Sequence, residues 1–192
     1  RTPLHMGQKE PWIGFQLQKM AERAQRSIHI QTPYSTANRQ LLGCLAGCAK
    51  DVKVTLLTNS MASSPNYPAF SNYHYNRRKF LETGTDIYEY QSEDSIHGKA
   101  IIFDGRYSAL GSFNLDDRSL YVDTETMLLV DSSGFSEQLG AAIEKYRRQS
   151  LKVGPDNRYE RSAQRRPLPV SKAKQRIMFA CSLFSRPFQF LI

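Results

Sequence analysis

Two side chains in one short stretch have the types and the spacing for phosphate chemistry. His97 and Lys99 precede an apolar run, residues 100 to 103, that is typical of a buried β-strand. Because strand side chains alternate between faces, positions 97 and 99 project from the same face. A lysine ammonium supplies a fixed positive charge for phosphoryl oxygens, and an imidazole can act as nucleophile or as general acid and base. The pair therefore predicts chemistry on a phosphate ester.

Three further polar residues follow at positions that complement this pair. Ser112 and Asn114 share one face of the chain as it leaves the next strand, and both can donate hydrogen bonds to phosphate oxygens. Glu125 begins the following strand and can accept the proton on the second nitrogen of His97. Each residue taken alone is equally typical of the polar face of a half-exposed strand. Together they predict a nucleophile, a residue that orients it, and a cradle for the phosphate.

The elements that must position these residues alternate between helical and extended patterns. Gly105 and Arg106 mark a tight turn between two strands. Strands that alternate with helices and then cluster predict an α/β fold, with a mixed β-sheet sandwiched between helices. The expected helices are residues 12 to 26, 38 to 50, 70 to 83 and 135 to 150, and the expected strands are residues 27 to 34, 52 to 58, 85 to 90, 99 to 104, 107 to 112 and 125 to 131.

The positive net charge of the chain is concentrated near its C-terminal end. The net charge is +8, yet residues 1 to 146 contain 15 Lys and Arg against 16 Asp and Glu, and residues 147 to 192 contain 11 against two. We therefore expect a domain at residues 1 to 151 and a basic tail at residues 152 to 192. A nearly neutral body offers no extended basic channel, which disfavours nucleic acid as a partner.

The tail itself has no clear periodicity until its aromatic end. It is polar, basic and proline-containing from about residue 152, which is typical of a linker or a disordered segment. Cations followed by aromatic residues also suit an interfacial anchor on an anionic membrane leaflet, and both interpretations stay open. The aromatic residues concerned are Phe179, Phe184, Phe188 and Phe190.

Cysteine content and apolar runs exclude several classes of protein. Three cysteines are too few for a disulfide framework, which favours a reducing compartment. Cys44 and Cys48 have helical spacing but no cluster of His or carboxylates completes a metal site, so we expect them to pack within a helix. No run reaches the roughly 18 apolar residues that span a bilayer.

The stretch HGKAIIFDGRYSALGSFN, residues 97 to 114, resembles the HKD motif of the phospholipase D superfamily. The resemblance continues through LDDRS and Glu125, and upstream through TPYS, LLTNSMAS and YNRRKFLETGTDIYEY. These flanks are similar to the C-terminal half of bacterial cardiolipin synthases and related phosphatidyltransferases, over roughly residues 12 to 150. The matching motif positions are His97, Lys99, Asp104, Gly111, Ser112 and Asn114.

The resemblance implies phosphatidyl transfer between alcohols, as in cardiolipin synthesis, through a phosphohistidine intermediate. It implies that neither a metal nor another cofactor takes part. It also implies an anionic phospholipid substrate and a location at the bacterial cytoplasmic membrane, peripheral on the cytoplasmic face.

The resemblance further assigns a role to each matching residue. His97 would be one of two active-site histidines, either nucleophile or general acid and base, with Glu125 orienting it. Lys99, Ser112 and Asn114 would bind the substrate phosphate. Asp104 and Gly111 would be structural residues of the motif.

The chain contains one copy of the motif, whereas a complete site in this family needs two. The other histidines, His5, His29 and His74, have no lysine two residues later. Because the chain starts at Arg1 and its flanks resemble a C-terminal half, we favour the second half of a two-motif protein. The alternative is a homodimer of single-motif chains, acting as a phosphodiesterase, a nuclease or a phospholipase D-type hydrolase. A scaffold without catalytic activity is disfavoured because the motif residues are intact.

Overall fold

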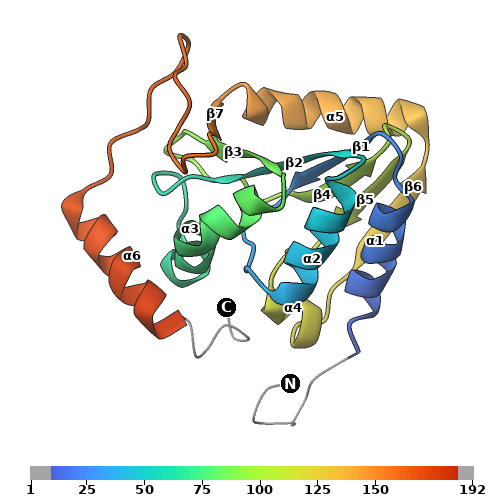
Figure 1. Cartoon of the computed structure of the whole chain (residues 1–192), viewed down its shortest axis with the longest axis horizontal. Helices are drawn as coiled ribbons and strands as arrows, with labels where there is room; N and C mark the ends of the chain where they lie inside the picture. Colours follow the sequence, from blue (N-terminus) through green and yellow to red (C-terminus); the bar gives the residue numbers. More distant parts are fainter. Residues whose placement is uncertain (1–9, 186–192) are drawn as a thin grey trace.

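Seven strands form one mixed sheet in the computed structural model, which describes residues 10 to 185 (Figure 1). The expected α/β class is confirmed. The strands are β1 Ser27–Gln31, β2 Lys53–Asn59, β3 Asp86–Tyr90, β4 Lys99–Phe103, β5 Tyr107–Gly111, β6 Met127–Asp131 and β7 Ser150–Val153. The helices are α1 Trp12–Arg23, α2 Arg39–Cys48, α3 Tyr67–Glu82, α4 Asp117–Tyr121, α5 Ser133–Arg147 and α6 Lys172–Ser185.

The strand order across the sheet is β6-β5-β4-β1-β2-β3-β7. The central strands β1, β2 and β3 are parallel, whereas β4, β5, β6 and β7 pair in antiparallel fashion. Parallel neighbours need a crossover connection, and α2 and α3 provide the two crossovers. This order brings the start of β4 beside the end of β1, although the two strands are far apart in the sequence.

Helices cover both faces of the sheet, as Figure 1 shows, with α5 on one face and α1, α2 and α3 on the other. The side chains of β1 divide between these faces because they alternate along the strand. Ile28 and Ile30 belong to the apolar cluster under α1, α2 and α3. Ile102 and Ile143 belong to the smaller cluster under α5. The sheet therefore separates two cores.

Four of the helices begin at a residue whose side chain caps the first turn. The side chains of Asn38, Asn66, Asp116 and Ser132 each accept a hydrogen bond from a backbone N–H three residues later. Such caps satisfy an N–H group that has no partner inside the helix. The beginnings of α2, α3, α4 and α5 are thus specified by local sequence.

Asp104 forms the tight turn between β4 and β5 and ties it to the start of β1. Its backbone φ is 56°, in the left-handed region that Asp tolerates better than most residues. Its carboxylate accepts hydrogen bonds from the backbone N–H groups of Gln25, Arg26 and Ser27, at 2.7 to 3.2 Å. The structural role expected for this motif residue has a physical basis in these bonds.

Replacing Asp104 with alanine should destabilise the fold by about 3 kcal/mol, because three N–H groups lose a charged acceptor and the turn loses a tolerant residue. Asp104→Asn should lower the free energy of unfolding by less than Asp104→Ala does.

The stability that Asp104 contributes should depend on pH. Burial raises the pKa of Asp104, but the backbone hydrogen bonds from Ser27, Gln25 and Arg26 outweigh it and lower the pKa below its usual 3.8. The charge therefore stabilises the fold above about pH 4, and this contribution disappears as the pH falls through the lowered pKa. Denaturant unfolding at pH 7 and pH 2.5 measures the difference in free energy of unfolding between wild type and Asp104→Asn. The same difference at both pH values would contradict a stabilising role for the Asp104 charge.

The C-terminal residues contain regular structure that the sequence pattern did not indicate. The strand β7 pairs with β3, so the expected boundary at residue 151 falls inside the sheet. The helix α6 packs along α3, where Met178 is fully buried and Phe179 contacts the ring of Tyr75. The expectation of an irregular tail is wrong for these two elements: β7 alternates over only four residues, with Leu151 and Val153 buried, and in the described part of α6 the buried residues are Met178 and Ser182, so neither gives a long period. The division into a catalytic part and a tail stays a prediction, and Phe188 and Phe190 lie outside the described residues.

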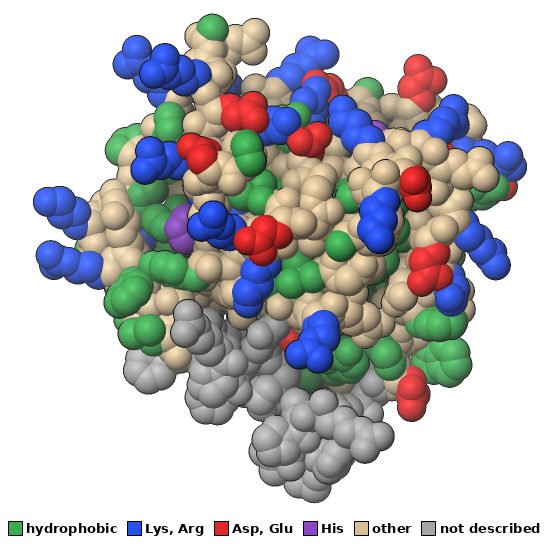
Figure 2. Space-filling view, viewed as in Figure 1, with side chains coloured by type: hydrophobic (Ala, Val, Ile, Leu, Met, Phe, Trp, Pro, Cys, Tyr) green, Lys and Arg blue, Asp and Glu red, His purple; other side chains and the backbone are tan. Residues whose placement is uncertain are grey.

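Charged side chains are mixed over the face drawn in Figure 2, where Lys and Arg alternate with Asp and Glu and form no continuous basic stripe. This distribution agrees with the nearly neutral body found by counting charges. Among residues 10 to 185, no helix combines the length and the apolar character that crossing a membrane requires.

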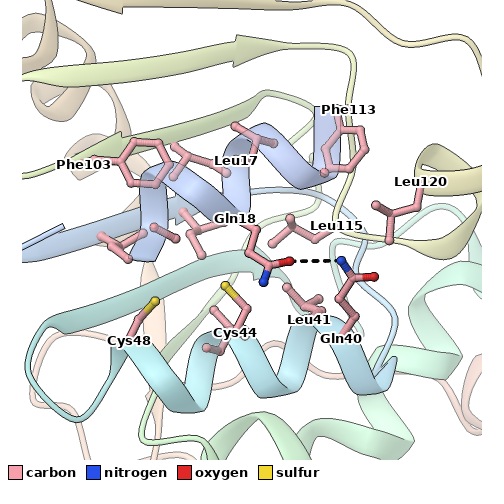
Figure 3. A pocket seen from close by; sticks show the side chains of 16 residues that line it. Leu17, Gln18, Gln40, Leu41, Cys44, Cys48, Phe103, Phe113, Leu115 and Leu120 are labelled. Atoms are coloured by element: carbon pink, nitrogen blue, oxygen red, sulfur yellow. Dashed lines mark hydrogen bonds between the residues drawn. The ribbon is translucent and has the colours of Figure 1, made fainter. Parts of the chain in front are cut away.

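Cys44 and Cys48 line a small apolar cavity of about 80 Å³ between α1, α2 and the sheet (Figure 3). Gln18 and Gln40 close one side of it with a hydrogen bond of 3.0 Å. Burial, reinforced by the neighbouring Cys48, raises the pKa of the Cys44 thiol to about 12, so the thiol stays protonated. The expected packing role of both cysteines is confirmed.

Candidate active site

Lys99 begins β4, beside the ends of β1 and β5, and His97 lies two residues before that strand. The Lys99 Nζ donates a hydrogen bond of 2.8 Å to the carbonyl oxygen of His97. The His97 side chain is exposed and Lys99 is half-buried. The Lys99 ammonium therefore lies against the backbone of His97, and the shared face expected for the two side chains stays a prediction because His97 precedes the strand.

The electrostatic surroundings of His97 keep its imidazole neutral. The Lys99 ammonium and, secondarily, burial lower the pKa of His97 below its usual 6.5. Its ring lies edge-on to Tyr34, with ring centroids 6.5 Å apart, and makes no hydrogen bond within residues 10 to 185. A neutral, exposed imidazole at neutral pH can act as a nucleophile or as a base.

Lys99 lies near two carboxylates. Burial lowers the pKa of Lys99, while the charges of Glu125 and Asp116 act in the opposite direction. Glu125 accepts a hydrogen bond of 2.7 Å from Ser119 Oγ. The hydrogen bond that we expected between Glu125 and His97 is not formed within the described chain, so the orienting role of Glu125 stays a prediction.

Ser112 and Asn114 follow β5 beside this pair. The Ser112 hydroxyl accepts a hydrogen bond of 2.9 Å from Thr126 N–H. The backbone N–H of Asn114 donates to Ser119 Oγ over 3.2 Å. At Gly111 a Cβ would lie 2.0 Å from the carbonyl oxygen of Thr126, so only glycine fits there. The backbone of this segment is fixed against the start of β6.

The sequence model of a family described as cardiolipin synthase, PLD-like domain, matches residues 17 to 147. This chain belongs to the phospholipase D superfamily. Cardiolipin synthase 1 of Staphylococcus epidermidis is 31% identical over 133 residues, which are 66% of this chain and 26% of that protein. A protein of Helicobacter pylori strain J99 is 28% identical over 163 residues, 78% of this chain and 32% of its own length. The chain thus spans about a third of these relatives or less.

Solved structures share the phospholipase D fold at low identity. The phosphatidylserine synthase of Haemophilus influenzae superposes with a TM-score of 0.73 and 16% identity, over 94% of this chain and 45% of that one. The phospholipase D family member Nuc of Salmonella typhimurium gives a TM-score of 0.63 and 16% identity, over 78% of this chain and 91% of its own. These similarities confirm the fold.

Asn59 positions the segment that precedes His97 in this phospholipase D-like domain, although the sequence did not single it out. It is fully buried at the end of β2. Its side chain donates to the carbonyl oxygen of Ile96 at 3.0 Å and accepts from the N–H of Ile96 at 2.8 Å. Both backbone groups of the residue before His97 are therefore held by one amide. In the sequence, the feature that could have indicated this role is the position of Asn59, a polar residue at the end of a buried strand.

Asp116 is a second residue to which the sequence analysis assigned no role. Its side chain caps α4 by accepting from Ser119 N–H at 2.7 Å. Burial raises the pKa of Asp116 to about 6, partly opposed by the hydrogen bonds from Ser119. The phospholipase D-like site thus contains a buried carboxyl group that titrates near neutral pH.

Gln31 and Ser35 complete the polar surroundings of the site. Gln31 lies directly behind Gly98, where a Cβ would approach Gln31 Nε2 to 2.5 Å. Gln31 Oε1, Ser35 Oγ and Asn114 Oδ1 are buried without a hydrogen-bond partner in the described structure. Because buried polar atoms in folded proteins nearly always have partners, these three atoms are exceptions among the described residues.

Proposed function

We propose that this chain is the C-terminal half of an enzyme that transfers a phosphatidyl group between alcohols in phospholipid synthesis of the cardiolipin type. The observation that carries the proposal is the pairing of His97 and Lys99 beside Ser112 and Asn114 in a chain that matches a cardiolipin synthase family. A half-buried cation beside a neutral imidazole suits attack on a phosphodiester.

The reaction would proceed in two steps. A histidine nitrogen attacks the phosphorus of the lipid, and the leaving alcohol takes a proton from a second histidine. The oxygen of the acceptor alcohol then attacks the phosphohistidine, gives its proton to the second histidine and releases the first. Lys99, Ser112 and Asn114 would hold the phosphate oxygens, and the lowered pKa of His97 suits the role of nucleophile or base.

The second histidine would come from another half of the same full-length protein. Exposed apolar side chains on α1 and on β6 support such a contact: Trp12, Leu128 and Leu129 are 66%, 60% and 52% exposed, with the two leucines on opposite faces of β6. β6, which carries both leucines, is the last strand at its edge of the described sheet. Apolar patches rimmed by polar residues are typical of docking surfaces.

The proposed substrate is an anionic phospholipid, and the protein would lie peripherally on the cytoplasmic face of a bacterial membrane. α6 supports this location because Ile177, Phe179 and Leu183 are about half exposed. Basic residues precede them on the same helix, and this combination favours an anionic interface.

A homodimeric phosphodiesterase is the second candidate. It is favoured by the size of the fold, because this chain covers 91% of the whole Salmonella Nuc chain. In that case two identical copies would each contribute one His97.

The two candidate functions differ in the molecule that accepts the phosphoryl group, a lipid alcohol or water. They also differ in the active species, which is the full-length protein or a dimer of this chain. The full-length protein, incubated with phosphatidylglycerol vesicles, should produce cardiolipin-type lipid detectable by mass spectrometry. The 192-residue chain alone should be inactive and monomeric. Cleavage of DNA or of a simple phosphodiester by a dimer of this chain, without lipid transfer, would replace the first candidate with the second; absence of both activities would refute both.

A further inference from the structure

A cavity with polar lining residues lies beneath α5, on the face of the sheet opposite to the apolar cavity. Its volume is about 270 Å³. The residues that line it include the side chains of His29, Lys53, Thr55, Tyr88, Glu144 and Arg147. Neither the proposed reaction nor the resemblance to the phospholipase D motif uses any of these groups.

Strand register makes three of these groups converge. His29 on β1 is the direct partner of Thr55 on β2, so both side chains project from the same face. Lys53 precedes Thr55 by two residues and shares that face. The side chains of His29, Lys53 and Thr55 make no hydrogen bond or ion pair within residues 10 to 185, although Thr55 is only 6% exposed. Two nitrogen donors and a hydroxyl therefore face one cavity without partners.

The remaining charges around the cavity leave it positive. The Arg147 guanidinium donates to both oxygens of Glu144, at 2.5 and 2.8 Å, and Arg148 Nε lies 3.3 Å from the same carboxylate. Arg147 also lies over the Tyr88 ring, 5.1 Å from its centroid. The only carboxylate in the lining is thus neutralised by two arginines, while Lys53 keeps an uncompensated charge.

We propose that this cavity binds a phosphate-bearing anion, held by Lys53, His29 and Thr55. A phosphate group accepts hydrogen bonds from an ammonium, an imidazole N–H and a hydroxyl together. The volume has room for a phosphate with a short polyol, such as a small phosphomonoester or the headgroup of a phospholipid.

This site is separate from the candidate active site. Lys99 and Ile101 share a face of β4, and Ile101 belongs to the cluster under α1, α2 and α3. His29 faces α5 instead. The Lys99 cation and the His29 cavity therefore lie on opposite faces of the sheet.

The state of His29 provides a direct probe of binding. Burial, followed by the positive charges of Lys53 and Arg147, lowers the pKa of His29, and the Glu144 charge opposes them. An anion in the cavity would stabilise the imidazolium and raise that pKa. The chain has four histidines, so His29 and His97 can be followed separately by NMR after isotope labelling of histidine.

The experiment titrates the 192-residue chain with inorganic phosphate at constant ionic strength, with chloride as the compensating anion. His29 signals should shift to saturation and its pKa should rise. Lys53→Met and Thr55→Val should each weaken this binding by at least about tenfold. Lys50→Met, which removes an exposed lysine on α2's side of the sheet, is the matched control and should leave the His29 response unchanged.

Outcomes at the two sites are distinguishable. A His97 shift reports phosphate in the candidate active site, and its failure bears on the proposed function alone. A His29 signal that does not respond, or equal weakening by Lys53→Met and Lys50→Met, would overturn the second site. Dihexanoyl phosphatidylglycerol below its micelle concentration then identifies the source: tighter binding than phosphate assigns a lipid headgroup, and weaker binding assigns a free phosphate compound.

Discussion

Replacing His97 with alanine in the full-length protein should slow phosphatidyl transfer by at least about a thousandfold. The proposed reaction needs this imidazole either to form a bond to phosphorus or to transfer a proton. A water molecule in its place would not be held in position to do either. The unfolding midpoint should not change, because the exposed His97 ring makes no hydrogen bond in the described structure. Lys99→Ala should reduce the rate similarly through weaker phosphate binding. Rates are measured by product formation under saturating lipid.

The pH profile separates a chemical role from a structural one. Because Lys99 and burial lower the pKa of His97, the imidazole stays neutral down to pH values below 6.5, and the fall in rate that His97 protonation causes should lie on the acid side of that value. Glu93→Ala alters an exposed residue four positions earlier and should leave both rate and profile unchanged. Turnover by His97→Ala within about tenfold of wild type would refute the assignment.

Replacing Glu89 with glutamine should destabilise the fold by about 3 to 5 kcal/mol. Glu89 is fully buried, and its Oε1 accepts hydrogen bonds from Arg77 at 2.8 Å and Tyr73 at 2.9 Å. Tyr159 donates to the other oxygen. Burial and the Glu89 charge raise the pKa of both tyrosines, so their hydroxyls remain donors. Glutamine would leave the Arg77 charge buried without a counter-charge.

A surface ion pair on α3, the helix that carries Arg77, is the matched control. Arg78 and Glu82 are 3.7 Å apart with side chains 75% and 66% exposed. Glu82→Gln should change the free energy of unfolding by less than about 1 kcal/mol in the same denaturant titration. Equal effects of the two substitutions would show that the buried cluster is not a special source of stability.

The same cluster holds the chain after β7 against α3. Arg77 Nε and one terminal nitrogen donate to Asn157 Oδ1 and Asn157 O, at 2.8 and 2.6 Å. Glu89→Gln should therefore also accelerate trypsin cleavage at Arg158 and Arg161. The cluster connects the sheet to the segment that leads to α6, and so to the surface proposed to meet the membrane.

The motif residues and most elements could be predicted from the sequence because the signals are local. The spacing of His97 and Lys99 in the motif is a local signal, and a turn at Gly105 joined β4 to β5 as expected. Helical patterns marked α2, α3 and α5 within a few residues. These features depend on neighbours within one turn or one hairpin, which a linear pattern contains.

Tertiary structure alone decided which distant residues complete the site. Asn59 reaches Ile96, and Gln31 lies behind Gly98, only because β4 inserts beside β1 in the sheet. The cavity around His29 and the burial of Glu89 likewise depend on the crossing of α5 and on the return of the chain through β7. Such contacts join residues far apart in the sequence, and no local period encodes them, because their free energy comes from burial and hydrogen bonding between separate elements. The sequence determined the chemistry that the chain carries, whereas the packing of the sheet decided what surrounds it.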